Sequence, residues 1–166
     1  MTGRWHHLAI GGLISLVVVL ATAKLSTWPD WQSVPDDHAL IRLSFTQSGV
    51  KTCRDRTPEE LAALPRNMRQ SQICDRRRAD IYVEMELNGT PVLAEHVPPT
   101  GISGSGPSRV YRGFELPAGT YDIALRLRDN PALDGFTSET TRQVQLAPGE
   151  SLAIDYDPSQ GGFFIH

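Results

Sequence analysis

The sequence predicts a mainly β protein, in which one apolar N-terminal helix precedes an antiparallel β-sandwich with one short helical insertion. Three observations predict this arrangement. Residues 8–23 contain no charged side chain. After residue 38, apolar and polar residues alternate with a period of two in several segments, which is typical of strands that are buried on one side. A helix-capping signal lies between the only two cysteines, Cys53 and Cys74.

The apolar segment is expected to anchor the protein in a membrane. Residues 8–25 reach the lower limit of the roughly 17–25 residues that cross a bilayer, provided that the side chain of Lys24 snorkels to the interface. Trp5 precedes this segment, and Trp28 and Trp31 follow it. Tryptophan favours the headgroup level of a membrane. We therefore interpret residues 8–25 as a retained transmembrane anchor with aromatic side chains on both sides.

A cleaved signal peptide is the alternative interpretation of the same segment. Arg4, a short apolar core and the small residues 21–23 also fit that pattern. Both interpretations place the rest of the chain outside the cytoplasm, because Arg4 favours an inside N-terminus and the segment after the helix contains Asp36 and Asp37. In a Gram-negative bacterium this topology means a single pass through the inner membrane, N-in, with a periplasmic C-terminal domain.

The chain is expected to have four parts. Residues 1–7 form a cytoplasmic tail, residues 8–25 the anchor and residues 26–37 an extended, Pro-containing tether. Residues 38–166 form one exported domain. Its length suits a single hydrophobic core.

Within that domain, residues 39–45, 81–87 and 121–127 alternate most clearly. Asn88-Gly89 favours a type I′ turn, which needs positive φ at both central residues. Residues 92–97 are therefore expected to return antiparallel to residues 81–87.

Further turn signals divide the second half of the domain. Pro and Gly at 117–119 and at 148–149 indicate reversals of the chain. We expect residues 144–146 and 152–156 to form the last hairpin, and residues 163–165 to add a terminal strand. About seven short, evenly spaced strands are typical of a sandwich of immunoglobulin-like or transthyretin-like type.

The insertion spans residues 53–74. Thr57, followed by Pro58 and by Glu60 three residues after it, is a capping box with proline at the first helical position. Pro65 should end this helix. Because the domain is exported, we expect a Cys53–Cys74 disulfide. A thiol pair that binds copper or exchanges disulfides is the alternative.

The insertion and the residues on either side of it form the most basic part of the chain. Residues 51–78 contain eight basic and four acidic residues, whereas residues 115–166 contain three basic and eight acidic ones. One interpretation is an interface with an acidic partner or with anionic lipid. The other is a solvated segment whose arginines meet Asp75, Asp80 or Glu84. The candidate interface residues are Arg66, Arg69, Arg76, Arg77 and Arg78.

Composition and motifs argue against several functions. The net charge of −3 and the pI of about 5.9 are unlike those of a general nucleic-acid binder. The five histidines have no metal-ligand spacing, and the Gly/Ser-rich residues 101–108 lack the features of a phosphate loop or of a hydrolase nucleophile. We therefore expect no enzymatic activity, no cofactor and no nucleic-acid partner.

Two segments carry a resemblance to known proteins. Residues 114–123 (FELPAGTYDI) and 146–152 (LAPGESL) resemble hairpin units of PEGA-type and transthyretin-like bacterial sandwiches. The layout of residues 26–29, 53–54, 57–62, 67–69 and 74 is similar to that of uncharacterised one-span bacterial membrane proteins. One span followed by a small exported β-domain also resembles accessory proteins of haem-copper oxidases, although no ligand motif is shared.

These features predict a membrane-anchored accessory or assembly subunit of a bacterial membrane complex, with a respiratory complex as one such partner. The runner-up is a periplasmic ligand- or copper-binding module, since thiolate and thioether ligands favour Cu(I). Its candidate ligands are His38, Cys53, Met68, Cys74, Met85 and His96.

Overall fold

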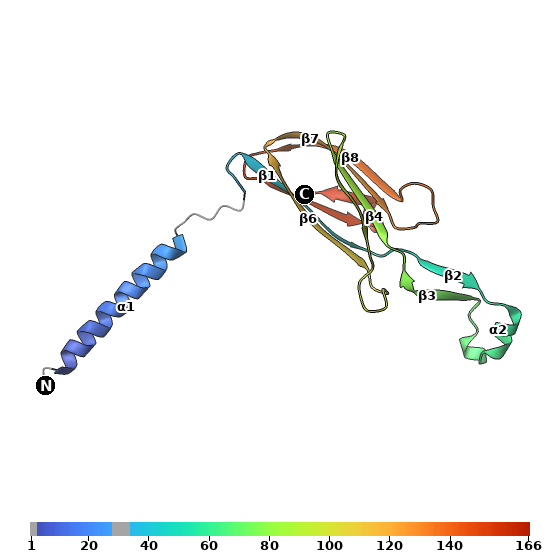
Figure 1. Ribbon diagram of the computed structural model, residues 1–166, viewed down its shortest axis with the longest axis horizontal. Helices are drawn as coiled ribbons and strands as arrows, with labels where there is room; N and C mark the ends of the chain where they lie inside the picture. The colour runs from blue at the N-terminus through green and yellow to red at the C-terminus, as the bar shows by residue number, and fades with distance from the viewer. Residues whose placement is uncertain (1–2, 28–33) are drawn as a thin grey trace. The chain divides into compact units, whose positions relative to one another are not determined.

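The computed structural model describes residues 3–27 and 34–166, and the chain divides into two units, Met1–Ser33 and Val34–His166. The first unit contains helix α1 (Gly3–Thr27), and the described part of the second contains strands β1 to β10 and three short helical segments (Figure 1).

Helix α1 is long and apolar enough to cross a membrane. Its span Trp5–Thr27 has 23 residues, and the mean hydropathy of its most apolar window is 2.2, with no side chain buried there. At about 1.5 Å per residue such a helix is about 35 Å long, which exceeds a hydrocarbon core of about 30 Å. Trp5 is 76% exposed, while Trp28 and Trp31 lie outside the described residues. The predicted anchor, residues 8–25, is the central part of this helix.

Two four-stranded sheets form the sandwich, in the orders β10-β9-β1-β6 and β5-β4-β7-β8. The strands of the first sheet are β1 (His38–Gln47), β6 (Ser108–Pro117), β9 (Ser151–Asp157) and β10 (Gly162–Ile165). Those of the second are β4 (Ile81–Leu87), β5 (Thr90–Val97), β7 (Gly119–Arg128) and β8 (Ser138–Leu146). Neighbouring strands are antiparallel except for β1 and β9, which are parallel. The predicted mainly β sandwich is confirmed.

The core lies between the two sheets and follows the predicted alternation. In β4, Ile81, Val83 and Met85 are fully buried, while the residues between them are partly exposed. Strands β1 and β7 bury alternate residues in the same way. Each of these three strands therefore contributes one face to a single core. Its remaining buried apolar residues are Ala39, Ile41, Leu43, Phe45, Val110, Leu116, Ile123, Leu125, Leu127, Leu146, Leu152, Ile154, Tyr156 and Phe163.

Local turn chemistry predicts the β4–β5 hairpin correctly. Asn88 and Gly89 have φ values of 51° and 75°, and Leu87 pairs with Thr90 across the two-residue loop. The terminal strand is also confirmed, since β10 pairs with β9.

The predicted last hairpin is wrong. Strand β8 pairs with β7, whereas β9 pairs with β1 and β10 in the opposite sheet. Gly149, with φ of 74°, does allow a sharp turn there. A turn reverses the chain, but it does not decide which sheet the next strand joins. By crossing over, β9 buries Leu152 and Ile154 against the core from the other side.

The sandwich has two ends with different connections. At the end where β1 begins, the Ala118 amide donates to the Asp37 carbonyl at 2.9 Å. We call this the tether end. At the end where β1 finishes, the Val50 amide donates to the Asp129 carbonyl at 3.1 Å. We call it the arm end. The ten residues of β1 separate the two ends by about 30 Å, since a strand rises about 3.3 Å per residue.

Candidate interaction arm

Residues 51–78 leave the arm end of the sandwich as a separate element, which we call the arm. Its stem is the hairpin of β2 (Lys51–Asp55) and β3 (Gln72–Arg78), and its tip contains α2 (Pro58–Ala63) and the 3₁₀ helix η1 (Arg66–Met68). Strands β2 and β3 form a two-stranded sheet of their own. Figure 1 shows this hairpin continuing beyond the sandwich, with α2 at its far end. None of the core residues belongs to the arm.

A disulfide joins the two strands of the stem. Cys53 lies directly opposite Cys74 in the strand register, and the two sulfurs are bonded. The expected disulfide is thus confirmed. Since a one-residue slip would turn every side chain to the other face, the disulfide holds the stem in one register. Neither cysteine is left as a thiolate.

The tip is organised by its capping box, as the sequence predicts. The Thr57 hydroxyl accepts from the Glu60 amide at 3.3 Å, and the Thr57 amide donates to a Glu60 carboxylate oxygen at 3.0 Å. Pro58 occupies the first turn, and the helix ends before Pro65. A six-residue helix is too short to be stable alone, so these local bonds are essential to its structure.

Arg54 connects the stem to the tip. Its guanidinium donates two hydrogen bonds to the Glu60 carboxylate, at 2.7 and 2.9 Å. These bonds, followed by the Thr57 amide, lower the pKa of Glu60 from 4.5 to about 2. Glu60 therefore remains ionised throughout the neutral and mildly acidic range. A planar guanidinium suits this two-point contact.

The base of the arm is fastened to the sandwich by Arg78. Its Nη1 donates to the Gly49 carbonyl at 3.2 Å, and its Nε donates to the Ser105 carbonyl at 3.1 Å. A backbone hydrogen bond, in which the Ala79 amide donates to the Val50 carbonyl at 2.8 Å, supports the same junction. Gly49 is required by close approach, since a Cβ there would lie 2.0 Å from the Ala79 carbonyl oxygen. The arm is thus fixed at its base.

The structure separates the three consecutive arginines that the sequence groups together. Arg78 holds the base, and Arg77 pairs with Asp80 at 3.3 Å. Arg76 is exposed and forms no ion pair among the described residues. At the tip, Arg69 donates to the Leu64 carbonyl at 3.0 Å, and Arg66 is exposed. The five candidate residues therefore differ in their surroundings, since Arg69, Arg77 and Arg78 already contact groups of the chain itself.

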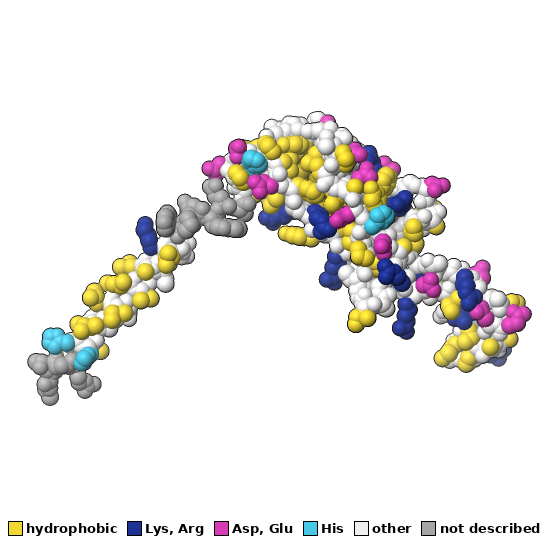
Figure 2. All heavy atoms as spheres, in the orientation of Figure 1, with side chains coloured by type: hydrophobic (Ala, Val, Ile, Leu, Met, Phe, Trp, Pro, Cys, Tyr) yellow, Lys and Arg dark blue, Asp and Glu magenta, His cyan; other side chains and the backbone are white. Residues whose placement is uncertain are grey.

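The tip exposes apolar side chains beside these charges. Met68 is 58% exposed, and Leu61 and Leu64 are half-buried; on the adjoining stem, Ile73 of β3 is 37% exposed. Figure 2 shows apolar side chains gathered at the far end of the arm, with basic and acidic side chains around them. A mixed surface of this kind, with methionine and arginine, is typical of protein interfaces.

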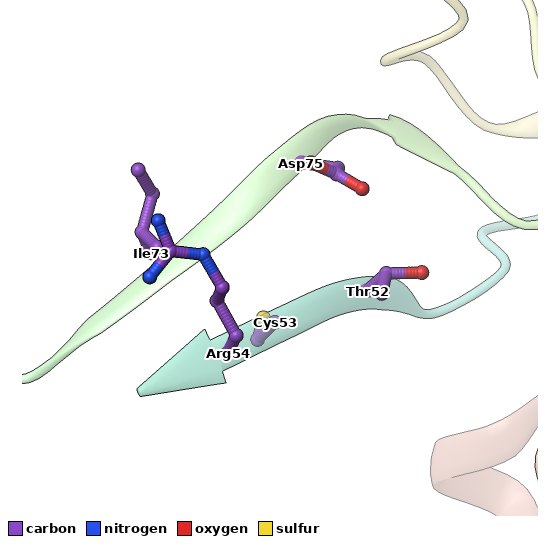
Figure 3. Close-up of a pocket in the computed structure, with 5 residues that line it drawn as sticks. All are labelled: Thr52, Cys53, Arg54, Ile73 and Asp75. Carbon is purple, nitrogen blue, oxygen red and sulfur yellow. The ribbon is translucent and has the colours of Figure 1, made fainter. Parts of the chain in front are cut away.

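Two hollows lie along the arm. One, of about 260 Å³, is formed on the stem by Thr52, Cys53, Arg54, Ile73 and Asp75; Arg54 extends beside Ile73 in Figure 3. The second, of about 380 Å³, lies at the junction of the arm and the sandwich, where the stem meets the loop after β7. The first is smaller than typical ligand pockets of about 300–1,000 Å³, and the second lies near the lower end of that range.

The candidate copper ligands are not brought together. Met85 is fully buried in the core and Met68 is on the arm. His38 hydrogen-bonds to the carboxylate of Asp37 at 2.8 Å, and His96 lies 4.8 Å from the ring of Tyr82. Within residues 3–27 and 34–166, no group of three His, Cys, Asp or Glu side chains is arranged to hold a metal ion.

A charged cluster that the sequence did not indicate lies on the outer face of the second sheet. Arg126 donates to Glu86 at 2.7 Å and to Glu84 at 2.5 Å, and these bonds, that to Glu86 foremost, raise the pKa of Arg126. The register places the three side chains on adjacent strands, since Glu84 pairs with Arg126. Sequence alone shows only alternating polar residues, so the partners emerge from strand pairing. Because these carboxylates all contact the one guanidinium of their own sheet, we interpret this cluster as structural.

The fold and the arm define a class: a β-sandwich protein with one candidate membrane helix and an exposed, disulfide-linked arm. The chain matches no protein-family model, no curated protein and no solved structure. The resemblance to PEGA-type sandwiches therefore stays a prediction.

Proposed function

We propose that the protein is a membrane-anchored, non-enzymatic accessory or assembly subunit that binds a larger membrane-protein complex through its arm. One observation carries this proposal. The arm adds nothing to the sandwich core, yet it is ordered by a disulfide, a capping box and an arginine clamp. Ordering a chain segment costs conformational free energy. An element that is already ordered in the free protein loses less entropy when it binds a partner. A role in binding therefore explains why the arm is ordered.

The position of the arm supports the same function. The arm leaves from the arm end, and the chain enters at the tether end, about 30 Å away along β1. The tip thus stands clear of the attachment point of the sandwich. The exposed Met68 and the half-buried Leu64 supply apolar contact area.

The membrane topology forms part of the proposal. Helix α1 supplies the anchor, and the charge difference between its flanks favours a cytoplasmic N-terminus and a periplasmic sandwich in a bacterial inner membrane. A disulfide is consistent with an oxidising compartment. A respiratory complex is one candidate partner, on architectural resemblance alone.

Site-specific photocross-linking in native membranes tests this function. A cross-linking amino acid replaces Met68 at the tip in the full-length protein, and a matched control replaces Thr141, an exposed residue of β8. We expect a discrete membrane-protein adduct from position 68 and none from position 141. Equal cross-linking from both positions, or no adduct from position 68 in correctly oxidised protein, would overturn the proposal.

A further inference from the structure

The junction hollow combines a mostly apolar lining with a single charged group. One wall is the base of the stem, the other is the loop after β7, and the volume is about 380 Å³. We call it the junction groove. Its lining residues are Val50, Lys51, Thr52, Cys53, Ala79, Asn130, Pro131 and Ala132.

The walls of the groove are held in place before any ligand binds. The Val50 amide donates to the carbonyl of Asp129, directly before the loop that forms the opposite wall. Within that loop, the Asn130 side chain accepts from the Ala132 amide at 3.0 Å. On the stem side, the disulfide keeps Cys53 in register. A preformed groove lowers the entropic cost of binding.

Lys51 supplies the charge of the groove. It is the only lysine of residues 34–166, since Lys24 belongs to α1. It is exposed and forms no ion pair among the residues that the structure describes. No acidic side chain lines the groove. The ammonium group is therefore free to pair with a carboxylate of another molecule.

We propose that the junction groove binds a segment of the partner protein that carries a carboxylate beside an apolar side chain. The carboxylate pairs with Lys51, and the apolar side chain lies against the disulfide and Pro131. This inference rests on the proposed function, because it names the chemistry that the partner presents at the arm. The apolar surface continues outside the groove, where Leu133 is 53% exposed.

A protein segment fits these observations better than a lipid surface does. The tip, residues 56–71, carries three basic and two acidic residues, so its net charge is close to neutral. Each basic residue near an anionic membrane is worth only about 1 kcal/mol. The groove, by contrast, lies at the base of the arm between two walls, where an extended chain can enter and a flat bilayer cannot.

Peptide binding tests the inference directly. The probe is a short Gly-Leu-Glu-Leu-Glu-Gly peptide, and its control has glutamine in place of both glutamates. Binding is followed by NMR chemical shifts of the full-length protein in nanodiscs of neutral lipid. We expect shifts centred on Val50, Lys51 and Ala132 with the acidic peptide, and binding of the neutral peptide weaker by about two- to fivefold, because an ion pair at an exposed lysine is weak.

Matched variants identify the charge that matters. Lys51→Met should weaken binding of the acidic peptide to the level of the neutral one, whereas Arg142→Met, at an exposed cation of β8, should leave it unchanged. Equal loss in both variants, or no preference for the acidic peptide, would overturn the inference. Binding of decanoate or of phosphatidylglycerol nanodiscs without binding of the peptide would overturn it as well.

The two proposals fail separately. If Lys51→Met leaves the cross-link from position 68 unchanged and the peptide does not bind, the groove is not the docking site and the proposed function stands. If position 68 gives no adduct in native membranes, the proposed function fails even where the peptide binds.

Discussion

The sandwich and the arm are stabilised in opposite ways. The sandwich buries alternate residues of its strands in one core, and residues such as Ile41 and Leu125 are at most 1% exposed. The arm has no buried apolar residue. It is held by the Cys53–Cys74 disulfide, the Thr57–Glu60 capping box and the hydrogen bonds of Arg78.

This difference shows that the arm can carry binding residues without weakening the core of the sandwich. Apolar burial is the main favourable contribution to folding, and the arm contributes none of the core residues. Its exposed side chains are therefore available for binding. Substitutions in the two regions should differ in the kind of damage they cause, and the following experiments examine that contrast.

The largest expected effect is a difference in stability between a leucine variant in the core and one in the arm. Leu125→Ala removes a fully buried side chain from β7 and should lower the free energy of unfolding by about 2–5 kcal/mol. Leu64→Ala, at a half-buried position of the arm, should lower it by less than about 1 kcal/mol. Denaturant unfolding of both variants measures the two values. Similar decreases in the free energy of unfolding would mean that the arm and the sandwich unfold as one cooperative unit.

Removal of the disulfide should act on the arm alone. In the Cys53→Ser/Cys74→Ser double variant, the arm loses a cross-link with a sequence separation of 21, which is worth about 3 kcal/mol in the chain-entropy model. Hydrogen exchange should speed up in β2 and β3 and stay slow in β4 and β7. Faster exchange throughout the sandwich would contradict the independence of the two regions.

Gly49→Ala tests the junction between the two regions. The added Cβ would collide with the Ala79 carbonyl, so we expect a loss of about 1–3 kcal/mol, with faster exchange of the Val50 and Ala79 amides. Gly113→Ala is the matched control, because a Cβ there would lie 3.7 Å from Leu40, an ordinary contact. Similar stability of the two variants would show that the backbone at the junction can move to accommodate the added Cβ.

The smallest expected effect is a pH dependence confined to the tip. The folded-state pKa of Glu60 is about 2, below its ordinary value of 4.5. A lowered pKa stabilises the folded form above the ordinary value, and this stabilisation is lost as the pH falls from about 4.5 towards 2. NMR should show the Glu60 carboxylate titrating near 2 and the α2 amides losing protection over that range. Glu60→Gln should abolish this dependence, and a titration near 4.5 in the unmodified protein would contradict the Arg54 contact.

Local signals in the sequence predict local structure well. The capping box at Thr57, the turn at Asn88-Gly89 and the buried face of β4 all form as expected. Each depends on residues a few positions apart, which interact before the rest of the chain is placed. The hairpin predicted for residues 144–156 is wrong for the complementary reason. Its turn is local, but the choice of sheet depends on β1, about a hundred residues earlier.

In the candidate site, too, some features were predicted from the sequence and others are seen only in the structure. Sequence identified the insertion, its two cysteines and its excess of basic residues. It did not reveal that Arg78 fastens the base while Arg76 stays exposed, because that distinction depends on the Gly49 and Ser105 carbonyls. The junction groove was also missed, since its walls come from residues 50–53, 79 and 130–132.

The sequence by itself determined the apolar helix, the period-two strands, the capped helix of the tip and the pairing of the two cysteines. Hydrophobic periodicity, turn chemistry and the scarcity of cysteines are enough for these, because each is a property of short segments or of a count. Only the tertiary structure decided that β9 joins the opposite sheet, that the arm does not pack on the core, and that Lys51 lines a groove. These features depend on which surfaces meet when distant segments bury a common core, and short-range patterns do not contain that information.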